Sequence, residues 1–138
     1  TLYLVVDRHD NDLSIKKNPK HNKGILAKEK KLSDDQIQEM ILSGVFELGG
    51  HTISHPYLPD LTFNEKFDEI NNCKDVLEQK FNTKVHSFAY PFGIYKDEDI
   101  EIVSNSDFNS AVSTMEGIAS LKSIYDLKRN PTVVLWGE

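Results

Sequence analysis

The chain contains a single cysteine, Cys73, among its 138 residues. One thiol cannot close an intramolecular disulfide or supply the several cysteines of a thiolate zinc site, so both are excluded. No stretch approaches the roughly 18 apolar residues that a transmembrane helix requires, and no signal-peptide pattern opens the chain. Because residues 1–6 already form an apolar run without an initiator Met, we expect the natural N-terminus, with any export signal, to lie upstream.

Cationic charge is also scarce, since 22 acidic residues outnumber 16 Lys and Arg residues and give a net charge of -6. Nucleic-acid binding depends mainly on clustered Lys and Arg, so a nucleic-acid partner is disfavoured. The hydrophobic fraction of 38% predicts one globular domain over residues 1–138. One basic cluster contains Asn, Pro and Gly but no interleaved aromatic residue, and we interpret it as a solvated insertion. Its members are Lys16, Lys17, Lys20, Lys23, Lys28, Lys30 and Lys31.

Strand-like and helix-like segments alternate along the chain. Ser33 with Gln36, and Thr62 with Glu65, form capping-box patterns at two helix starts, and Gly44 stands where a left-handed residue would end the first helix. We predict strands at residues 1–6, 45–48, 84–90, 109–114 and 132–136, and helices at residues 33–43, from 62 onward and at 96–104. The second helix is expected to bury a stripe of Phe63, Phe67, Ile70, Leu77 and Phe81, with Cys73 close to it.

This alternation predicts an α/β fold of right-handed βαβ units with a mainly parallel sheet. The pattern alone leaves open whether the sheet is open and doubly wound or closed into a barrel. On either scaffold, functional residues belong at the C-terminal ends of the strands. Four segments occupy such positions: the acidic loop at residues 7–12, and residues 51–55, 90–93 and 113–114.

His51 and His55 are the candidate metal ligands. They lie four residues apart just after a predicted buried strand, and Gly49 and Gly50 before them allow the backbone to turn sharply. Neutral imidazole is the commonest metal donor in proteins. A His-x-x-x-His pair alone is weak evidence for a metal site, so the context has to come from the strand end at residues 87–93.

The two segments together are specific. GGHTISH at residues 49–55, followed by YPFG at residues 90–93, resembles the second and third motifs of the polysaccharide deacetylase family. These proteins are metal-dependent carbohydrate esterases of the NodB-homology type, carbohydrate esterase family 4. The resemblance covers most of the chain and is closest to the branch whose third motif reads Ala-Tyr-Pro-Phe-Gly, where many relatives have Arg in place of Ala89. It implies a distorted (β/α) barrel with fewer strands than the standard eight.

The same resemblance implies an activity, a location and a set of site residues. The activity is hydrolysis of an acetyl group, most often N-acetyl, from an amino-sugar polysaccharide, with Zn²⁺ or another divalent metal such as Co²⁺. An extracellular or cell-envelope location follows from the same source. The implied roles are metal ligation by His51 and His55, oxyanion binding by the backbone N–H of Phe92, shaping of the acetyl pocket by Tyr90 and Pro91, and orientation of site carboxylates by Arg129.

Two motifs of the family are absent from the chain: the Asp-Asp strand end, which supplies the catalytic base and a third ligand, and the late Leu-x-Leu-His, whose His is the general acid. Losing a general base or acid typically lowers the rate by a factor of about 10² to 10⁴. Three explanations stay open. The Asp pair lies on an upstream strand, or Asp7, Asp10 or Asp12 is the third ligand, or the chain is a non-catalytic carbohydrate- or partner-binding module on a degenerate deacetylase scaffold.

Overall fold

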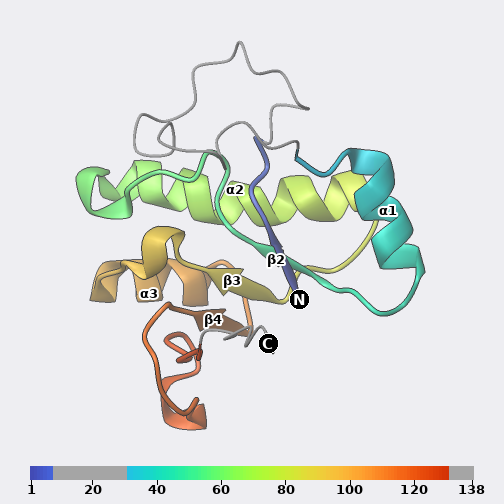
Figure 1. Cartoon of the computed structure of the whole chain (residues 1–138). Helices are drawn as coiled ribbons and strands as arrows, with labels where there is room; N and C mark the ends of the chain where they lie inside the picture. The colour runs from blue at the N-terminus through green and yellow to red at the C-terminus, as the bar shows by residue number, and fades with distance from the viewer. Residues whose placement is uncertain (8–30, 131–138) are drawn as a thin grey trace, which may run out of the picture.

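A computed structural model of the chain describes residues 1–7 and 31–130. Four parallel strands form one sheet in the order β1-β2-β3-β4 (Figure 1). The strands are β1 (Leu2–Leu4), β2 (Leu48–Gly50), β3 (Ser87–Ala89) and β4 (Ser110–Val112). The helices are α1 (Asp34–Leu42), α2 (Phe63–Phe81) and α3 (Asp97–Asn105), with 3-10 turns at Leu58–Asp60, Pro91–Gly93 and Leu121–Ser123. The predicted alternation around a parallel sheet is confirmed.

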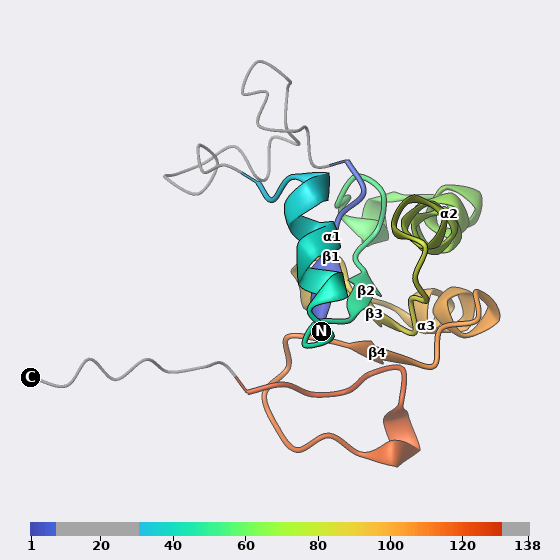
Figure 2. The same cartoon turned by 90° about the vertical axis from the view of Figure 1, so that its right-hand side faces the viewer.

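Consecutive strands are also neighbours in the sheet, and this order separates the two possibilities that the sequence left open. A doubly wound sheet reverses its direction of winding at a switch point, whereas the strand order here does not reverse. Right-handed crossovers that always step in one direction place their helices on one face, as in a barrel. Accordingly, α2 and α3 contact each other on the same face of the sheet (Figure 2). The described residues thus form part of a (β/α) barrel.

Local hydrogen bonds fix the helix starts that the capping boxes predicted. The side chains and backbone N–H groups of Ser33 and Gln36 bond reciprocally at the start of α1, and those of Thr62 and Glu65 do so at the start of α2. Gly44 follows α1 with a φ of +73°, and nothing lies within 4 Å of its Cβ position. The left-handed backbone, rather than a lack of space, therefore explains why glycine occupies this position. None of the helices in the described ranges is long and apolar enough to cross a membrane.

Removing the α2 cap is expected to lower the free energy of unfolding by about 1 kcal/mol. Thr62→Ala deletes the hydroxyl that accepts the Glu65 N–H, whereas Thr62→Ser keeps it. In urea unfolding followed by circular dichroism, the Ser variant should stay within about 0.5 kcal/mol of the wild type. An Ala variant as stable as the wild type would show that this cap contributes nothing.

The buried face of α2 differs from the predicted stripe in the first half of the helix. Phe63 and Phe67 were predicted to be buried but are 49% and 38% exposed. Positions 70, 73 and 77 lie on one helix face, and this face continues backwards to position 66 because residues four apart share a face. Lys66 is buried there beside α3. The rest of the stripe is buried as expected: Ile70, Cys73, Leu77 and Phe81.

The strand predicted at residues 45–48 was placed too early in the chain, because β2 begins three residues later, at Leu48. Val45 and Phe46 are 80% and 43% exposed in the connection after α1. Their β-branched and aromatic side chains suggested a strand, but the sheet pairs β1 with Leu48 to Gly50 instead. The strand predicted at residues 132–136 lies outside the described residues. A parallel bridge between Val112 and Leu127 was not predicted.

The two glycines of β2 face opposite sides of the sheet. A Cβ on Gly50 would lie 3.0 Å from Cys73 Sγ, so Gly50 faces the helix layer. A Cβ on Gly49 would overlap the ring of Tyr3, its register partner in β1, on the other face. Since side chains alternate along a strand, His51 follows on the same face as Gly49, away from α2.

Candidate functional site

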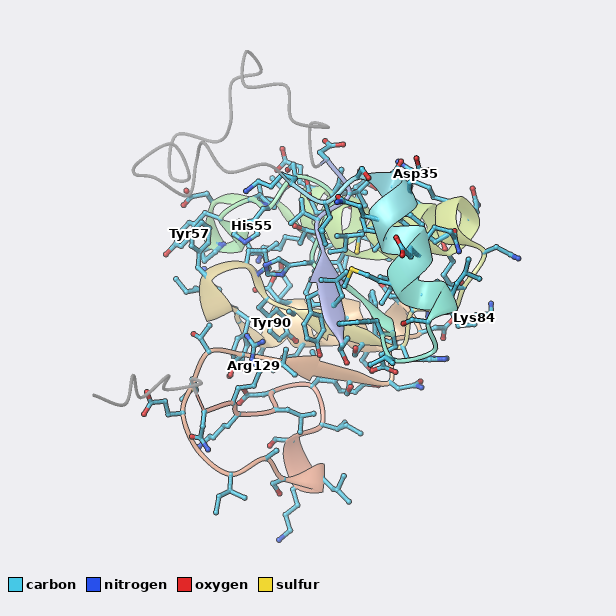
Figure 3. The ribbon with its side chains drawn as sticks, turned by 45° about the vertical axis from the view of Figure 1, so that its right-hand side comes forward. Asp35, His55, Tyr57, Lys84, Tyr90 and Arg129 are labelled. Atoms are coloured by element: carbon cyan, nitrogen blue, oxygen red, sulfur yellow. The ribbon has the colours of Figure 1, made fainter. Side chains whose placement is uncertain are left out.

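The segments that follow the four strands meet at one edge of the sheet, as the sequence predicted. Figure 3 shows His55, Tyr57, Tyr90 and Arg129 at this end of the molecule, while Lys84, which precedes β3, lies toward the other end. Three contacts join neighbouring segments: the Asp7 N–H donates to the Ile53 carbonyl at 2.8 Å, the rings of His55 and Phe92 lie 4.9 Å apart, and Gly93 lies directly against Thr114.

The backbone of β3 orients the ring of His51. Its Nδ1 lies 2.6 Å from the carbonyl oxygen of Ala89. Because a carbonyl can only accept, Nδ1 must carry the proton, and the lone pair of the neutral ring is on Nε2. Metal-ligating histidines are commonly held in this way by their other ring nitrogen. The ring of His55 lies 4.6 Å away, centroid to centroid, and inclined by 71°. The pair is therefore suited to supply two nitrogen donors to one metal ion.

The loop that carries the two histidines has an unusual backbone. Thr52 and His55 are in the left-handed region, with φ angles of 70° and 56°. For a β-branched residue such as Thr52 this conformation is an outlier that costs about 1 to 3 kcal/mol. The buried hydroxyl of Thr52 donates to the His51 carbonyl and accepts the His55 N–H at 3.0 Å. This hydroxyl thus links the two candidate ligands.

A carboxylate from α2 holds the middle of the same loop. Glu69 Oε2 accepts the N–H groups of Ile53 and Ser54, each at 2.9 Å, and Oε1 accepts the Ser54 hydroxyl at 2.6 Å. Sequence reasoning missed Glu69, since no local spacing connects a helix carboxylate to residues 51–55. It also gave Thr52 no role, although its position beside the first histidine was a visible signal.

The Pro91–Gly93 turn places Phe92 beside His55. Phe92 has a φ of 59°, and its ring also contacts Tyr57 at a centroid distance of 6.2 Å. Gly93 follows with a φ of +68°, and a Cβ there would overlap the Thr114 side chain after β4. Glycine is therefore required both by the backbone conformation and by the space. The turn fixes the backbone N–H of Phe92 next to a proline, which has none.

The side chain of Tyr90 belongs to the core. It is 1% exposed, its ring stacks on Tyr95 at 4.6 Å, and its hydroxyl donates to the Tyr125 carbonyl at 2.9 Å. Burial, assisted by the negative charge of Asp99, raises the pKa of the Tyr90 phenol, so this group stays protonated at neutral pH. Its influence on the site comes through the position of the turn that follows it.

Arg129 contacts residues in or directly after both outer strands of the described sheet, β1 and β4. Its Nε donates to the Ser113 carbonyl just after β4 at 2.7 Å. Its guanidinium carbon lies 5.9 Å from the centroid of the Tyr3 ring in β1, within the range of a cation–π contact. Since Tyr3 and His51 share a face of the sheet, the positive charge lies on the face that carries the candidate ligands.

In residues 1–7 and 31–130, no group of three or more His, Cys, Asp or Glu side chains is arranged to hold a metal. Asp7 is exposed beside the histidine loop but does not complete such a group. Burial raises the pKa of the Cys73 thiol to about 12, so it is no thiolate donor at neutral pH. Asp10 and Asp12 lie outside the described residues. Within the part of the chain that the structure describes, two of the predicted donors thus lie together and no third donor joins them.

The polysaccharide deacetylase family model matches residues 10–111, more than half of the chain. "Putative polysaccharide deacetylase YxkH" of Bacillus subtilis is 28% identical over 71% of this chain and 35% of its own length. The Streptococcus pyogenes deacetylase PplD, solved in complex with acetate, has a TM-score of 0.70 and 30% identity over 75% of this chain and 46% of that chain.

A mutant of BA3943, a pseudoenzyme of carbohydrate esterase family 4, is also similar, with a TM-score of 0.50 and 28% identity over 55% of this chain and 28% of that chain. The chain spans less than half the length of each of these three proteins. The match to the family model and the paired histidine and YPFG segments agree with each other. The chain therefore belongs to the polysaccharide deacetylase family.

Proposed function

We propose that the chain forms part of a metal-dependent hydrolase that removes acetyl groups, N-acetyl groups in particular, from an amino-sugar polysaccharide. The observation that carries the proposal is the pair of imidazoles at the C-terminal edge of the sheet. The Ala89 carbonyl orients the His51 ring with its lone pair on Nε2, and the His55 ring lies in contact with it. An extracellular or envelope glycan is the proposed substrate, by analogy with the family.

The metal in this proposal is Zn²⁺, with Co²⁺ as a functional substitute. His51 and His55 would hold it, since imidazole nitrogen suits both ions. A divalent metal supplies Lewis-acid activation of water and of the acetyl carbonyl when it is bound. A third donor and the general base would come from carboxylates outside the described residues, either on another part of the protein or from Asp10 or Asp12. Asp7 is the weaker candidate because it completes no donor group in the structure.

The remaining residues have proposed roles in binding the acetyl group. The backbone N–H of Phe92 would stabilise the oxyanion that forms on the acetyl carbonyl, and Pro91 would form one wall of the pocket. Tyr90 would fix this wall from behind, because its ring is buried beneath the turn. Arg129 would orient the carboxylates, with its guanidinium held by Ser113 and Tyr3.

The metal ligands can be tested by calorimetric titration of Zn²⁺. The His51→Ala/His55→Ala variant is expected to lose at least about 100-fold in affinity, because loss of two ligands should exceed the 10- to 100-fold typical of residues behind the ligands. His86→Ala is the matched control, since His86 is exposed and precedes β3, far from the ligand edge. Equal affinity of the double variant and the wild type would refute the assignment of the ligands.

Acetate release from an acetylated amino-sugar polymer, with Zn²⁺ or Co²⁺ present, tests the activity of the protein that carries this chain. A second candidate function is a catalytically inactive carbohydrate- or partner-binding module, which the similarity to a family 4 pseudoenzyme favours. Polymer binding without acetate release would support the binding module, whereas release that depends on His51 and His55 would support the hydrolase.

A further inference from the structure

The Glu69 carboxylate is bound to the histidine loop at three points. Two successive backbone N–H groups, those of Ile53 and Ser54, converge on Oε2, and the Ser54 hydroxyl donates to Oε1. Hydrogen bonds to an ionised carboxylate are about twice as strong as bonds between neutral groups. Glu69 is half-buried and precedes Ile70, which is fully buried in the core, so the helix holds the carboxylate in a fixed position.

The loop needs this support because its conformation is intrinsically unfavourable. The left-handed backbone at Thr52 and at His55 persists only where surrounding contacts determine it. On the β1 side, the Thr52 carbonyl accepts the Val6 N–H at 3.2 Å, and the Ile53 carbonyl accepts the Asp7 N–H. On the α2 side, the N–H groups of Ile53 and Ser54 are bound by Glu69. The loop is thus held between β1 and α2, and Glu69 supplies the contacts of one side.

We propose that Glu69 is a positioning residue that holds His51 and His55 in their ligating arrangement; this rests on the proposed metal site. Removing its carboxylate leaves the N–H groups of Ile53 and Ser54 without their acceptor and allows the backbone at Thr52 to relax. The hydrogen bond that the His55 N–H donates to the Thr52 hydroxyl depends on that backbone. Relaxation therefore separates the two rings, which now lie 4.6 Å apart.

Glu69 acts through the loop rather than as a metal ligand. Both of its carboxylate oxygens face loop donors, and it forms no three-membered donor group with His51 and His55. A substitution should consequently weaken metal binding without abolishing it, unlike the loss of a ligand. Residues behind metal ligands typically contribute a factor of about 10 to 100 in affinity.

Three variants of the chain test this role. Glu69→Ala removes the carboxylate. Glu69→Gln keeps one oxygen for the two N–H groups and an amide that can donate to the Ser54 hydroxyl. Asp68→Ala removes the same charge from the adjacent, exposed position of α2. Each is studied by Zn²⁺ calorimetry, by hydrogen exchange of the Ile53 and Ser54 amides, and by the nuclear Overhauser effect between the two imidazole rings, at a temperature where circular dichroism shows every variant folded.

Glu69→Ala is expected to lower the Zn²⁺ affinity by about 10- to 100-fold. It should also accelerate hydrogen exchange of the Ile53 and Ser54 amides and weaken the nuclear Overhauser effect between the two imidazole rings. Glu69→Gln should recover most of each property, and Asp68→Ala should match the wild type. Unchanged amide exchange and ring contact in Glu69→Ala, or an equal loss in Asp68→Ala, would overturn the proposal. If the wild-type chain binds no Zn²⁺, the proposed role of the two histidines as metal ligands fails. Amide hydrogen exchange and the nuclear Overhauser effect between the rings then still show whether Glu69 positions the histidines.

Discussion

Lys66→Met is expected to lower the free energy of unfolding by about 3 to 5 kcal/mol, the cost of removing one partner of a buried ion pair. The Lys66 ammonium lies 3.1 Å from Asp99 Oδ1, and both side chains are almost fully buried between α2 and α3. Methionine can fill the space of the lysine stem but leaves the carboxylate without a counter-charge. Since whole domains are stable by only about 5 to 15 kcal/mol, urea unfolding should show a large fall in the midpoint.

Lys80→Met is the matched control, because it makes the same change on the same helix where the ion pair with Asp34 is exposed. It should cost less than about 1 kcal/mol. Adding Asp99→Asn to Lys66→Met removes the unpaired charge while keeping an acceptor for the Lys96 N–H, which Asp99 Oδ2 now binds at 2.7 Å. The double variant should therefore be more stable than Lys66→Met alone. A cost of Lys66→Met no larger than that of Lys80→Met would contradict the prediction.

The pKa of Lys66 determines how the stability that this ion pair contributes changes with pH. Burial, the largest single effect, lowers this pKa, but the hydrogen bonds and charges of Asp99 and Glu98 together raise it above the ordinary value of 10.5. A pKa that is higher in the folded state gives stability that is present below the unfolded pKa and lost as the pH rises through the folded value. The difference in the free energy of unfolding between the wild type and Lys66→Met should therefore become smaller only above about pH 10.5.

Gly93→Ala is expected to lower the free energy of unfolding by about 2 to 5 kcal/mol. About 1 to 2 kcal/mol comes from the left-handed backbone, with a φ of +68°, and a further 1 to 3 kcal/mol from the overlap of the new Cβ with Thr114. The overlap should also displace the adjacent Phe92, whose ring contacts His55. Urea unfolding measures the stability, and the shift of the His55 ring resonances reports the displacement.

Gly44→Ala separates the two contributions to this cost. Gly44 has a similar φ of +73°, but nothing lies within 4 Å of its Cβ position, so the variant should cost only the backbone part, about 1 to 2 kcal/mol. Thr114→Gly in the Gly93→Ala background should relieve the overlap and restore the His55 resonances. An equal loss of unfolding free energy in the two Gly→Ala variants would show that the overlap with Thr114 adds nothing to the cost of Gly93→Ala.

Sequence alone determined the features that depend on neighbours within a few residues. The capping boxes at Ser33 and Thr62 and the left-handed Gly44 were predicted because a helix end is fixed by groups three or four positions apart. The parallel α/β class followed from alternation. The deacetylase family followed from two short motifs, at residues 49–55 and 90–93. Both contain the glycine or proline residues that their backbone turns require.

Tertiary structure decided what depends on how these elements rotate and align against each other. The rotation of α2 buried Lys66 in place of Phe67 because Asp99 of α3 supplies its counter-charge. The register of the sheet, rather than β-propensity, decided that β2 begins at Leu48. The same packing aimed Glu69 at the histidine loop and Phe92 at His55. Such contacts join residues far apart in the chain, so no local pattern encodes them, and only the assembled sheet and helices bring their partners within hydrogen-bonding distance.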